Sequence, residues 1–128
     1  MRIFDTGATR DEDHVKNDYE GFISPLVIES FGNYMTIHRK QADGNIRESD
    51  NWQRGIPEDV YMKSMWRHFL DVWKLHRGYI VEKDGHIWTK EEALNALLFN
   101  VMGMQHENLK QPKTPIILSH AQFNDNEK

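Results

Sequence analysis

Hydrophobic residues recur at helical spacing in three stretches of the chain, and polar stretches separate them. The first stretch follows Ser24-Pro25, a pair that suits the N-cap and the first position of a helix. Ile28, Phe31 and Met35 then share one face of that helix. The pattern predicts a first helix over about 25–40, preceded by a polar, extended arm in residues 1–20.

A second helix is expected to begin near Pro57, because proline lacks the N–H that a first helical turn leaves unpaired. Two stripes run along this helix, about a quarter-turn or more apart. The apolar stripe consists of Met62, Trp66, Phe69 and Trp73, and the second stripe consists of Tyr61, Ser64, His68, Asp71 and Leu75. Within the second stripe, His68 and Asp71 are three residues apart, so both can point at one ligand.

A third helix is predicted from about Thr89 to Lys110, because Thr89 and Glu92 match a capping box. A short β-hairpin is expected before it, near 79–88, since the Asp84-Gly85 pair suits a tight turn between two apolar triplets. Gly103 is expected to permit a close helix contact. The residues expected on the buried face of this third helix are Leu94, Leu97, Leu98, Val101 and Met102.

Together these elements predict a mainly α protein, a small bundle of about three main helices with an N-terminal arm and a hairpin. Residues 1–110 are interpreted as one domain and residues 111–128 as a tail. The apolar patch 116–118 in the tail must pack on the body or meet another subunit, and three helices alone bury little surface. We therefore expect a homo-oligomer.

Composition narrows the range of functions expected for this chain. The 128 residues are 38% hydrophobic, enough for one modest core, and contain no cysteine for a disulfide or thiolate zinc site. With 20 acidic and 16 basic residues the net charge is −4, and the basic residues are scattered. General nucleic-acid binding is therefore not expected, and a small molecule is the favoured ligand. No apolar run is long enough for a membrane span, so a soluble, cytoplasmic protein is expected.

Carboxylates and imidazoles fall on all three predicted helices, where they can hold Mg²⁺ or Mn²⁺ against a polyphosphate. Structural roles stay open for each of them: Asp71 suits an i,i+4 ion pair with Arg67, Glu92 a capping box, and His68 a core position. Asn100, between Phe99 and Val101, needs partners for its amide in a network or a ligand. The candidates on the first and second helices are Glu29, His68 and Asp71, and those on the third are Glu91, Glu92, Asn95, Asn100, His106 and Glu107.

Several of these segments resemble a phage-encoded family of dATP/dGTP diphosphohydrolase-like proteins, related to the all-α MazG-type nucleoside triphosphate pyrophosphohydrolases. The similar segments span residues 4 to 110, and Asn51-Trp52-x-x-Gly55 with Arg67-His68 is the most specific. They are Gly7-Ala8-Thr9-Arg10-Asp11, Lys16 with Asp18-Tyr19-Glu20-Gly21-Phe22, Ser24-Pro25-Leu26, Asp50-Asn51-Trp52-Gln53-Arg54-Gly55, Arg67-His68-Phe69-Leu70-Asp71, and Phe99-Asn100 with His106-Glu107.

The resemblance implies metal-dependent cleavage of a purine deoxynucleoside triphosphate to the monophosphate and pyrophosphate. MazG-type enzymes hold metal with Glu-x-x-Glu and Glu-x-x-Asp, for which the nearest substitutes are His68-x-x-Asp71 and Glu92-x-x-Asn95. A non-catalytic nucleotide-binding protein, acting as a sponge for a defence signal or as a regulator, is the alternative, and a structural interaction module is a third. The implied roles are metal binding by Asp71 with Glu29, Glu91 or Glu92, catalysis by His68 and Asp71, and nucleotide binding by Lys16, Asn51, Trp52, Arg67 and Asn100.

Overall fold

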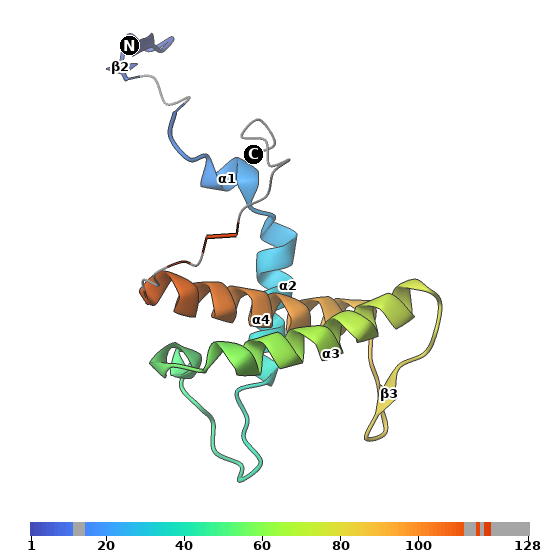
Figure 1. The fold of residues 1–128 in the computed structure, drawn as a ribbon. Helices are drawn as coiled ribbons and strands as arrows, with labels where there is room; N and C mark the ends of the chain where they lie inside the picture. The colour runs from blue at the N-terminus through green and yellow to red at the C-terminus, as the bar shows by residue number, and fades with distance from the viewer. Residues whose placement is uncertain (12–14, 112–114, 116, 119–128) are drawn as a thin grey trace. The chain divides into compact units, whose positions relative to one another are not determined.

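A computed structural model of the chain describes residues 1–11, 15–111, 115 and 117–118 (Figure 1). The described part is mainly helical, with four α-helices and two small antiparallel hairpins, which confirms the predicted fold class. The chain divides into two compact units, residues 1–49 and residues 50–128.

The first unit holds a hairpin of β1 (Arg2–Ile3) and β2 (Thr9–Arg10), then α1 (Tyr19–Phe22) and α2 (Pro25–Ile37). The predicted arm is therefore partly folded by local pairing. Helix α2 starts where the sequence predicts, because the Ser24 hydroxyl accepts a hydrogen bond from the Val27 N–H at 3.3 Å.

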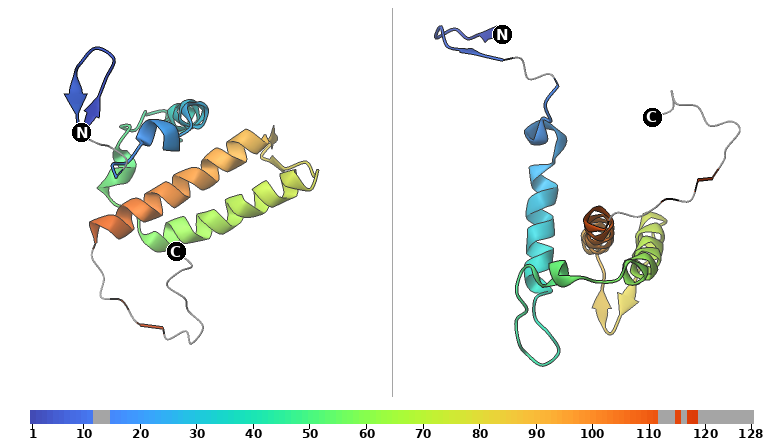
Figure 2. Two further views of the ribbon diagram at one scale, coloured as in Figure 1. Left: turned by 90° about the horizontal axis from the view of Figure 1, so that it is seen from above. Right: turned by 60° about the vertical axis from the view of Figure 1, so that its left-hand side comes forward.

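The second unit begins with a 3-10 helix, η1 (Asn51–Arg54), followed by α3 (Glu58–His76). A hairpin of β3 (Glu82–Lys83) and β4 (His86–Ile87) leads into α4 (Lys90–Lys110), which lies antiparallel beside α3 (Figures 1 and 2). The predicted hairpin, capping box and helix end are confirmed. Asp84 and Gly85 both have positive φ, 51° and 80°, as the tight turn requires.

The contact face of α4 differs from the prediction. Leu94 and Val101 are 46% and 47% exposed, so their assignment to the buried face is wrong. Gly103 explains the difference, since a Cβ at this position would lie 2.4 Å from ring atoms of Tyr61. Small residues on this face let the two helices approach closely. The buried residues of α4 are Ala93, Asn95, Ala96, Asn100, Gly103 and Glu107.

On α3, the second of the two predicted stripes turns toward α4. Tyr61 and Asp71 are buried, whereas His68 is half-buried. The apolar stripe with Trp66 and Trp73 is exposed instead. The pair of helices thus has a partly polar inner face and an aromatic outer face.

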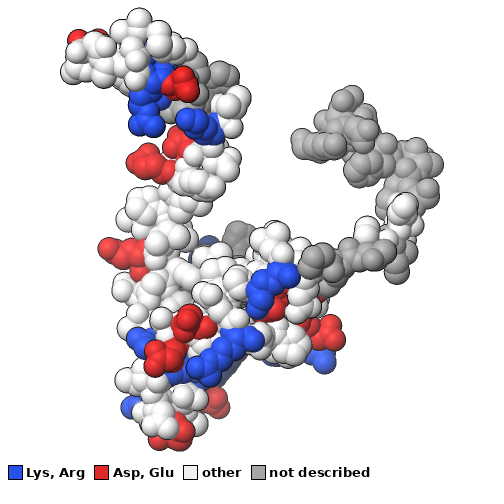
Figure 3. Space-filling view, turned by 90° about the vertical axis from the view of Figure 1, so that its left-hand side faces the viewer, with Lys and Arg blue, Asp and Glu red and all other residues white. Residues whose placement is uncertain are grey.

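Charged side chains of both signs are interspersed on the face drawn in Figure 3. This distribution agrees with the scattered basic residues of the sequence. In the tail, Ile117 and Leu118 are exposed, whereas Ile116 and most of residues 112–128 lie outside the described residues. Within the described part of the chain, no helix has the length and apolar character needed to cross a membrane.

Candidate functional site

Four polar side chains are buried in α3 and α4. Asp71, Asn95, Asn100 and Glu107 have relative exposures of 4%, 6%, 6% and 5%. Burial of a carboxylate without a partner is unfavourable, so such groups are paired or bind a ligand. Helical proteins build their sites from such inward side chains on facing helices. The seam between α3 and α4 is therefore where a functional site is to be sought.

At one end of the seam, a lysine of the β3–β4 hairpin lies beside Asp71. The Lys83 ammonium forms an ion pair with the Asp71 carboxylate. The hairpin is held in place by the Trp88 N–H, which donates to the Val81 carbonyl at 2.9 Å, and by the burial of Val81. Because the turn at 84–85 sets the register, Lys83 pairs with His86 across the hairpin.

Three aromatic rings lie near this ion pair. The Lys83 ammonium lies 4.9 Å from the centre of the Trp88 ring, within the range of a cation–π contact. The rings of His68 and His86 each lie 6.1 Å from that of Trp88. We call His68, Asp71, Lys83, His86 and Trp88 the hairpin-end cluster. It combines an indole face with one fixed cation and two imidazoles.

The pKa of His68, within this cluster, departs from its ordinary value. Burial lowers the pKa of His68, and the neighbouring Lys83 ammonium lowers it further, while Asp71 opposes the shift. The Nδ1 atom of His68 is buried, has no hydrogen-bond partner in the described part of the chain, and lies 3.9 Å from the Asp71 carboxylate. Burial and the Lys83 ammonium thus favour the neutral form of the ring.

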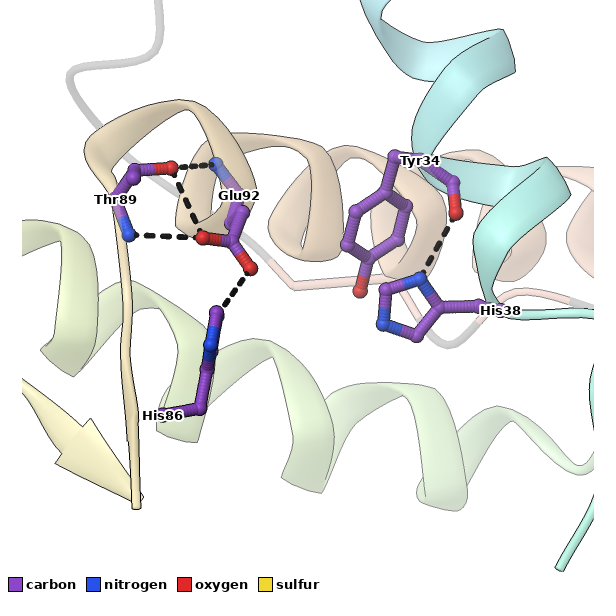
Figure 4. Close-up of polar contacts among 5 residues, drawn as sticks. All are labelled: Tyr34, His38, His86, Thr89 and Glu92. Atoms are coloured by element: carbon purple, nitrogen blue, oxygen red, sulfur yellow. Dashed lines mark hydrogen bonds and ion pairs between the residues drawn. The ribbon is translucent and has the colours of Figure 1, made fainter. Parts of the chain in front are cut away.

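His86 joins the cluster to the start of α4 (Figure 4). Its Nε2 atom lies 2.7 Å from one oxygen of Glu92, whose other oxygen accepts hydrogen bonds from the N–H and hydroxyl of Thr89. Burial raises the pKa of Glu92, but the hydrogen bonds from His86 and Thr89 outweigh it and lower the pKa overall. The capping role that the sequence leaves open for Glu92 is confirmed.

At the other end of the seam, η1 meets the second half of α4. The Trp52 ring lies 4.9 Å from the His106 ring and 6.2 Å from the Phe99 ring. The Lys110 ammonium donates to the Gln53 carbonyl at 3.3 Å. We call Trp52, Tyr61, Phe99, His106 and Glu107 the loop-end cluster.

Tyr61 lies inside the loop-end cluster, with its ring 6.0 Å from that of Phe99. Burial raises the pKa of Tyr61, and the negative charge of Glu107 raises it further. The Tyr61 hydroxyl is buried and has no hydrogen-bond partner among the described residues. This cluster packs the two helices together through its rings and keeps Tyr61 neutral.

The predicted site residues of the second unit are divided between the two ends. His68 and Asp71 meet in the hairpin-end cluster, whereas Trp52 belongs to the loop-end cluster. Between Glu92 and His106, α4 rises by about 21 Å at its ordinary pitch. The two groups are therefore too far apart to touch one small ligand together.

The remaining predicted residues take separate places. Asn100 is buried and donates to the Ala96 carbonyl at 2.7 Å, which satisfies part of its amide within α4. Arg67 donates to the Ser64 hydroxyl at 3.0 Å, while Asp71 pairs with Lys83. Asn51 is half-buried in η1, and Glu91 is exposed in the first turn of α4. Lys16 and Glu29 are exposed side chains of the first unit.

The described residues do not gather three or more His, Asp or Glu side chains into a group that could hold a metal ion. Asp71 and Glu92, the candidates nearest the hairpin, are engaged by Lys83 and by Thr89 with His86. The predicted Mg²⁺ or Mn²⁺ stays a prediction.

Sequence reasoning missed Lys83, His86 and Trp88 as site residues. All three belong to the hairpin that the Asp84-Gly85 turn predicts, so their mutual proximity follows from the turn. Their approach to Asp71 does not follow from the turn, because it depends on how the hairpin folds back over α3. Searches against protein-family models, characterised proteins and solved structures find no match to this chain.

Proposed function

We propose that this protein binds a purine nucleotide at the hairpin-end cluster. The observation that carries the proposal is the Lys83 ammonium 4.9 Å over the Trp88 ring, with the rings of His68 and His86 both 6.1 Å from that indole. A nucleobase stacked on an aromatic side chain gains about 1–3 kcal/mol. The Lys83 ammonium and an imidazole N–H can donate to phosphate oxygens. The choice of a purine rests on the resemblance to the phage family.

Asp71 supports the proposal through Lys83. Because the Asp71 carboxylate is buried and paired with Lys83, it directs the ammonium to one place beside the indole. A polyphosphate arriving there competes with Asp71 for the same cation. Lys83 and His86 remain accessible for this exchange, since their side chains are 41% and 58% exposed. We place this function in the cytoplasm.

Hydrolysis of the bound triphosphate is the second candidate function, and His68 favours it. Its lowered pKa favours the neutral imidazole, the form that can accept a proton from an attacking water. A nucleotide sponge or regulator would use the same cluster without turnover. Metal-dependent hydrolysis with Mg²⁺ or Mn²⁺ is thus part of the proposal to be tested, as is plain binding.

The binding proposal is tested by thermal unfolding of the full chain with dATP, dGTP, ATP, GTP and inorganic triphosphate. A ligand at about 100 times its dissociation constant adds roughly 2.7 kcal/mol to the free energy of unfolding. We expect purine nucleotides to raise the melting temperature of the parent protein. Trp88→Leu should remove that rise, measured against the melting temperature of the variant alone.

Trp66→Leu is the matched control, because Trp66 is an exposed tryptophan outside both clusters. It should leave the nucleotide-induced rise unchanged. If no nucleotide raises the melting temperature of the parent protein at millimolar concentration, both nucleotide-based functions are refuted. If Trp66→Leu abolishes the shift and Trp88→Leu does not, the site lies elsewhere.

Turnover is tested by following pyrophosphate release from dATP and dGTP with Mg²⁺ or Mn²⁺. Release that is lost in His68→Gln, while the nucleotide-induced thermal shift survives, supports hydrolysis. Thermal shifts without any release support a sponge or regulator.

A further inference from the structure

The side of α3 that faces away from α4 carries a row of large apolar side chains. Met62, Trp66, Phe69 and Trp73 are 42%, 69%, 51% and 55% exposed. We call these four residues the aromatic stripe. They are spaced by four, three and four residues, which is the repeat that places side chains along the seam of two coiled helices. A helix face with this spacing is suited to pair with another helix.

The aromatic stripe is symmetric about the middle of α3. Met62 and Trp73 lie equally far from the point between residues 67 and 68, and so do Trp66 and Phe69. A two-fold axis through this point would place Met62 of one copy against Trp73 of the other, and Trp66 against Phe69. Such a self-complementary surface is what an isologous pair requires.

Charge at the two ends of α3 favours an antiparallel pair. The first turn carries Glu58 and Asp59, whereas the last turn carries Lys74 and His76, with Arg77 as the C-cap. Antiparallel pairing brings the acidic end of one copy to the basic end of the other. Asp59 and Arg77 are 18 residues apart, which is five helical turns, so they lie on the same flank of the aromatic stripe.

A hollow beside Trp73 offers a place for the partner's side chains. It has a volume of about 260 Å³ and is lined by Leu70, Trp73, Lys74, Arg77 and Tyr79. In the antiparallel pair, Met62 of the second copy lies opposite Trp73. Methionine is flexible and fills irregular gaps, so its side chain suits this hollow.

We propose that the aromatic stripe of α3 docks against the same stripe of a second copy of this chain, antiparallel and about a two-fold axis. The exposed parts of Trp66, Phe69 and Trp73 amount to roughly 350 Å². Met62, Leu70, Tyr79 and the charged flanks extend this surface toward the about 800 Å² per partner found in stable interfaces. This pairing uses residues outside the hairpin-end cluster and is independent of nucleotide binding.

The test is sedimentation equilibrium of the full chain over a range of concentrations. We expect a dimer for the parent protein. Trp66→Glu should weaken dimerisation by about thirty-fold or more, the loss typical of a central aromatic in an interface. Val101→Glu is the matched control, because Val101 is an exposed apolar residue of α4 away from the stripe. It should leave the dimer intact, and circular dichroism should show that both variants remain helical.

Charge reversal tests the antiparallel register. Asp59→Arg and Arg77→Asp should each weaken the dimer, because like charges then face each other across the two-fold axis. The double variant should restore it, since the pair of opposite charges is rebuilt in exchanged positions. The proposal is overturned if the parent protein is a monomer at its highest soluble concentration, or if Trp66→Glu leaves the dimer intact. Failure of the double variant to recover overturns the antiparallel register.

Discussion

Replacing Gly103 by alanine should destabilise the second unit, although the same change in an exposed helix is stabilising. Alanine is favoured over glycine in a helix interior by about 0.8–1 kcal/mol. At Gly103, however, the added Cβ would lie 2.4 Å from two ring carbons of Tyr61 and 2.6 Å from its hydroxyl oxygen. Tyr61 is 1% exposed, so its ring is enclosed by other residues and cannot move aside without displacing them. Forcing an extra methyl group into a packed interface costs about 1–3 kcal/mol.

The net expectation for Gly103→Ala is a loss of up to about 2 kcal/mol in the free energy of unfolding. Urea titration followed by tryptophan fluorescence reports on this unit, because all four tryptophans lie in residues 50–128. Gly32→Ala in α2 is the matched control, since nothing lies within 4 Å of a Cβ built there. Followed by circular dichroism, it should be neutral or stabilising by up to about 1 kcal/mol.

A double variant identifies the cause. Adding Tyr61→Leu removes the ring, so Gly103→Ala should cost less in that background than in the parent protein. The reasoning is refuted if Gly103→Ala stabilises the protein as a solvent-exposed position would. It is also refuted if the cost of Gly103→Ala is unchanged when Tyr61 is replaced.

Three further changes test the hairpin end of the seam. Lys83→Met should lower the free energy of unfolding in urea by about 1–3 kcal/mol, because it leaves the buried Asp71 carboxylate unpaired; an Asp71→Asn change in the same protein should recover part of the loss. Thr89→Ala should cost about 1 kcal/mol in the same assay by removing the cap of α4, and an unchanged midpoint would contradict the capping box. His68 should make the free energy of unfolding depend on pH. Its pKa is lowered in the folded protein, so the unfolded chain takes up a proton first as the pH falls. The contribution of His68 to stability is therefore complete above pH 6.5, the ordinary histidine value, and decreases as the pH drops below it. In His68→Gln the urea midpoint should depend less on pH between pH 6.5 and 5. An unchanged dependence of the midpoint on pH would contradict this role of His68.

Local signals in the sequence predict the helices and the hairpin well. Ser24 caps α2, Thr89 caps α4, and the Asp84-Gly85 turn makes the hairpin, as the residue types at these positions indicate. Each of these features depends on hydrogen bonds or dihedral preferences within a few residues. Such preferences need no contact with a distant part of the chain.

The buried face of α4 could not be predicted in the same way. Periodicity favours Leu94 and Val101 as core residues because leucine and valine are usually buried. The structure buries Ala96 and Gly103 instead, and at Gly103 the close approach of Tyr61 on α3 leaves no room for a side chain. This contact joins residues on two helices, and the size of the partner side chain is not visible in the sequence of α4 alone.

The hairpin-end cluster, too, could be predicted only in part from the sequence. The spacing of His68 and Asp71 predicts that they share one face of α3, and both do belong to the same cluster. Lys83 reaches Asp71 from a separate element, so its position depends on the direction in which the hairpin folds. A local pattern therefore identifies two members of the cluster, and tertiary structure supplies the others.

The two proposals can be separated because they use opposite sides of α3. His68 and Asp71 face the seam with α4, whereas Trp66 and Phe69 are exposed on the outer side. A helix carries these two sets independently, since residues on its opposite faces do not touch. Trp66→Glu should therefore weaken dimerisation but keep the nucleotide-induced thermal shift, and Trp88→Leu should remove the thermal shift but keep the dimer. Loss of both properties in Trp66→Glu would mean that the second copy completes the nucleotide site, and that the seam of one chain does not suffice.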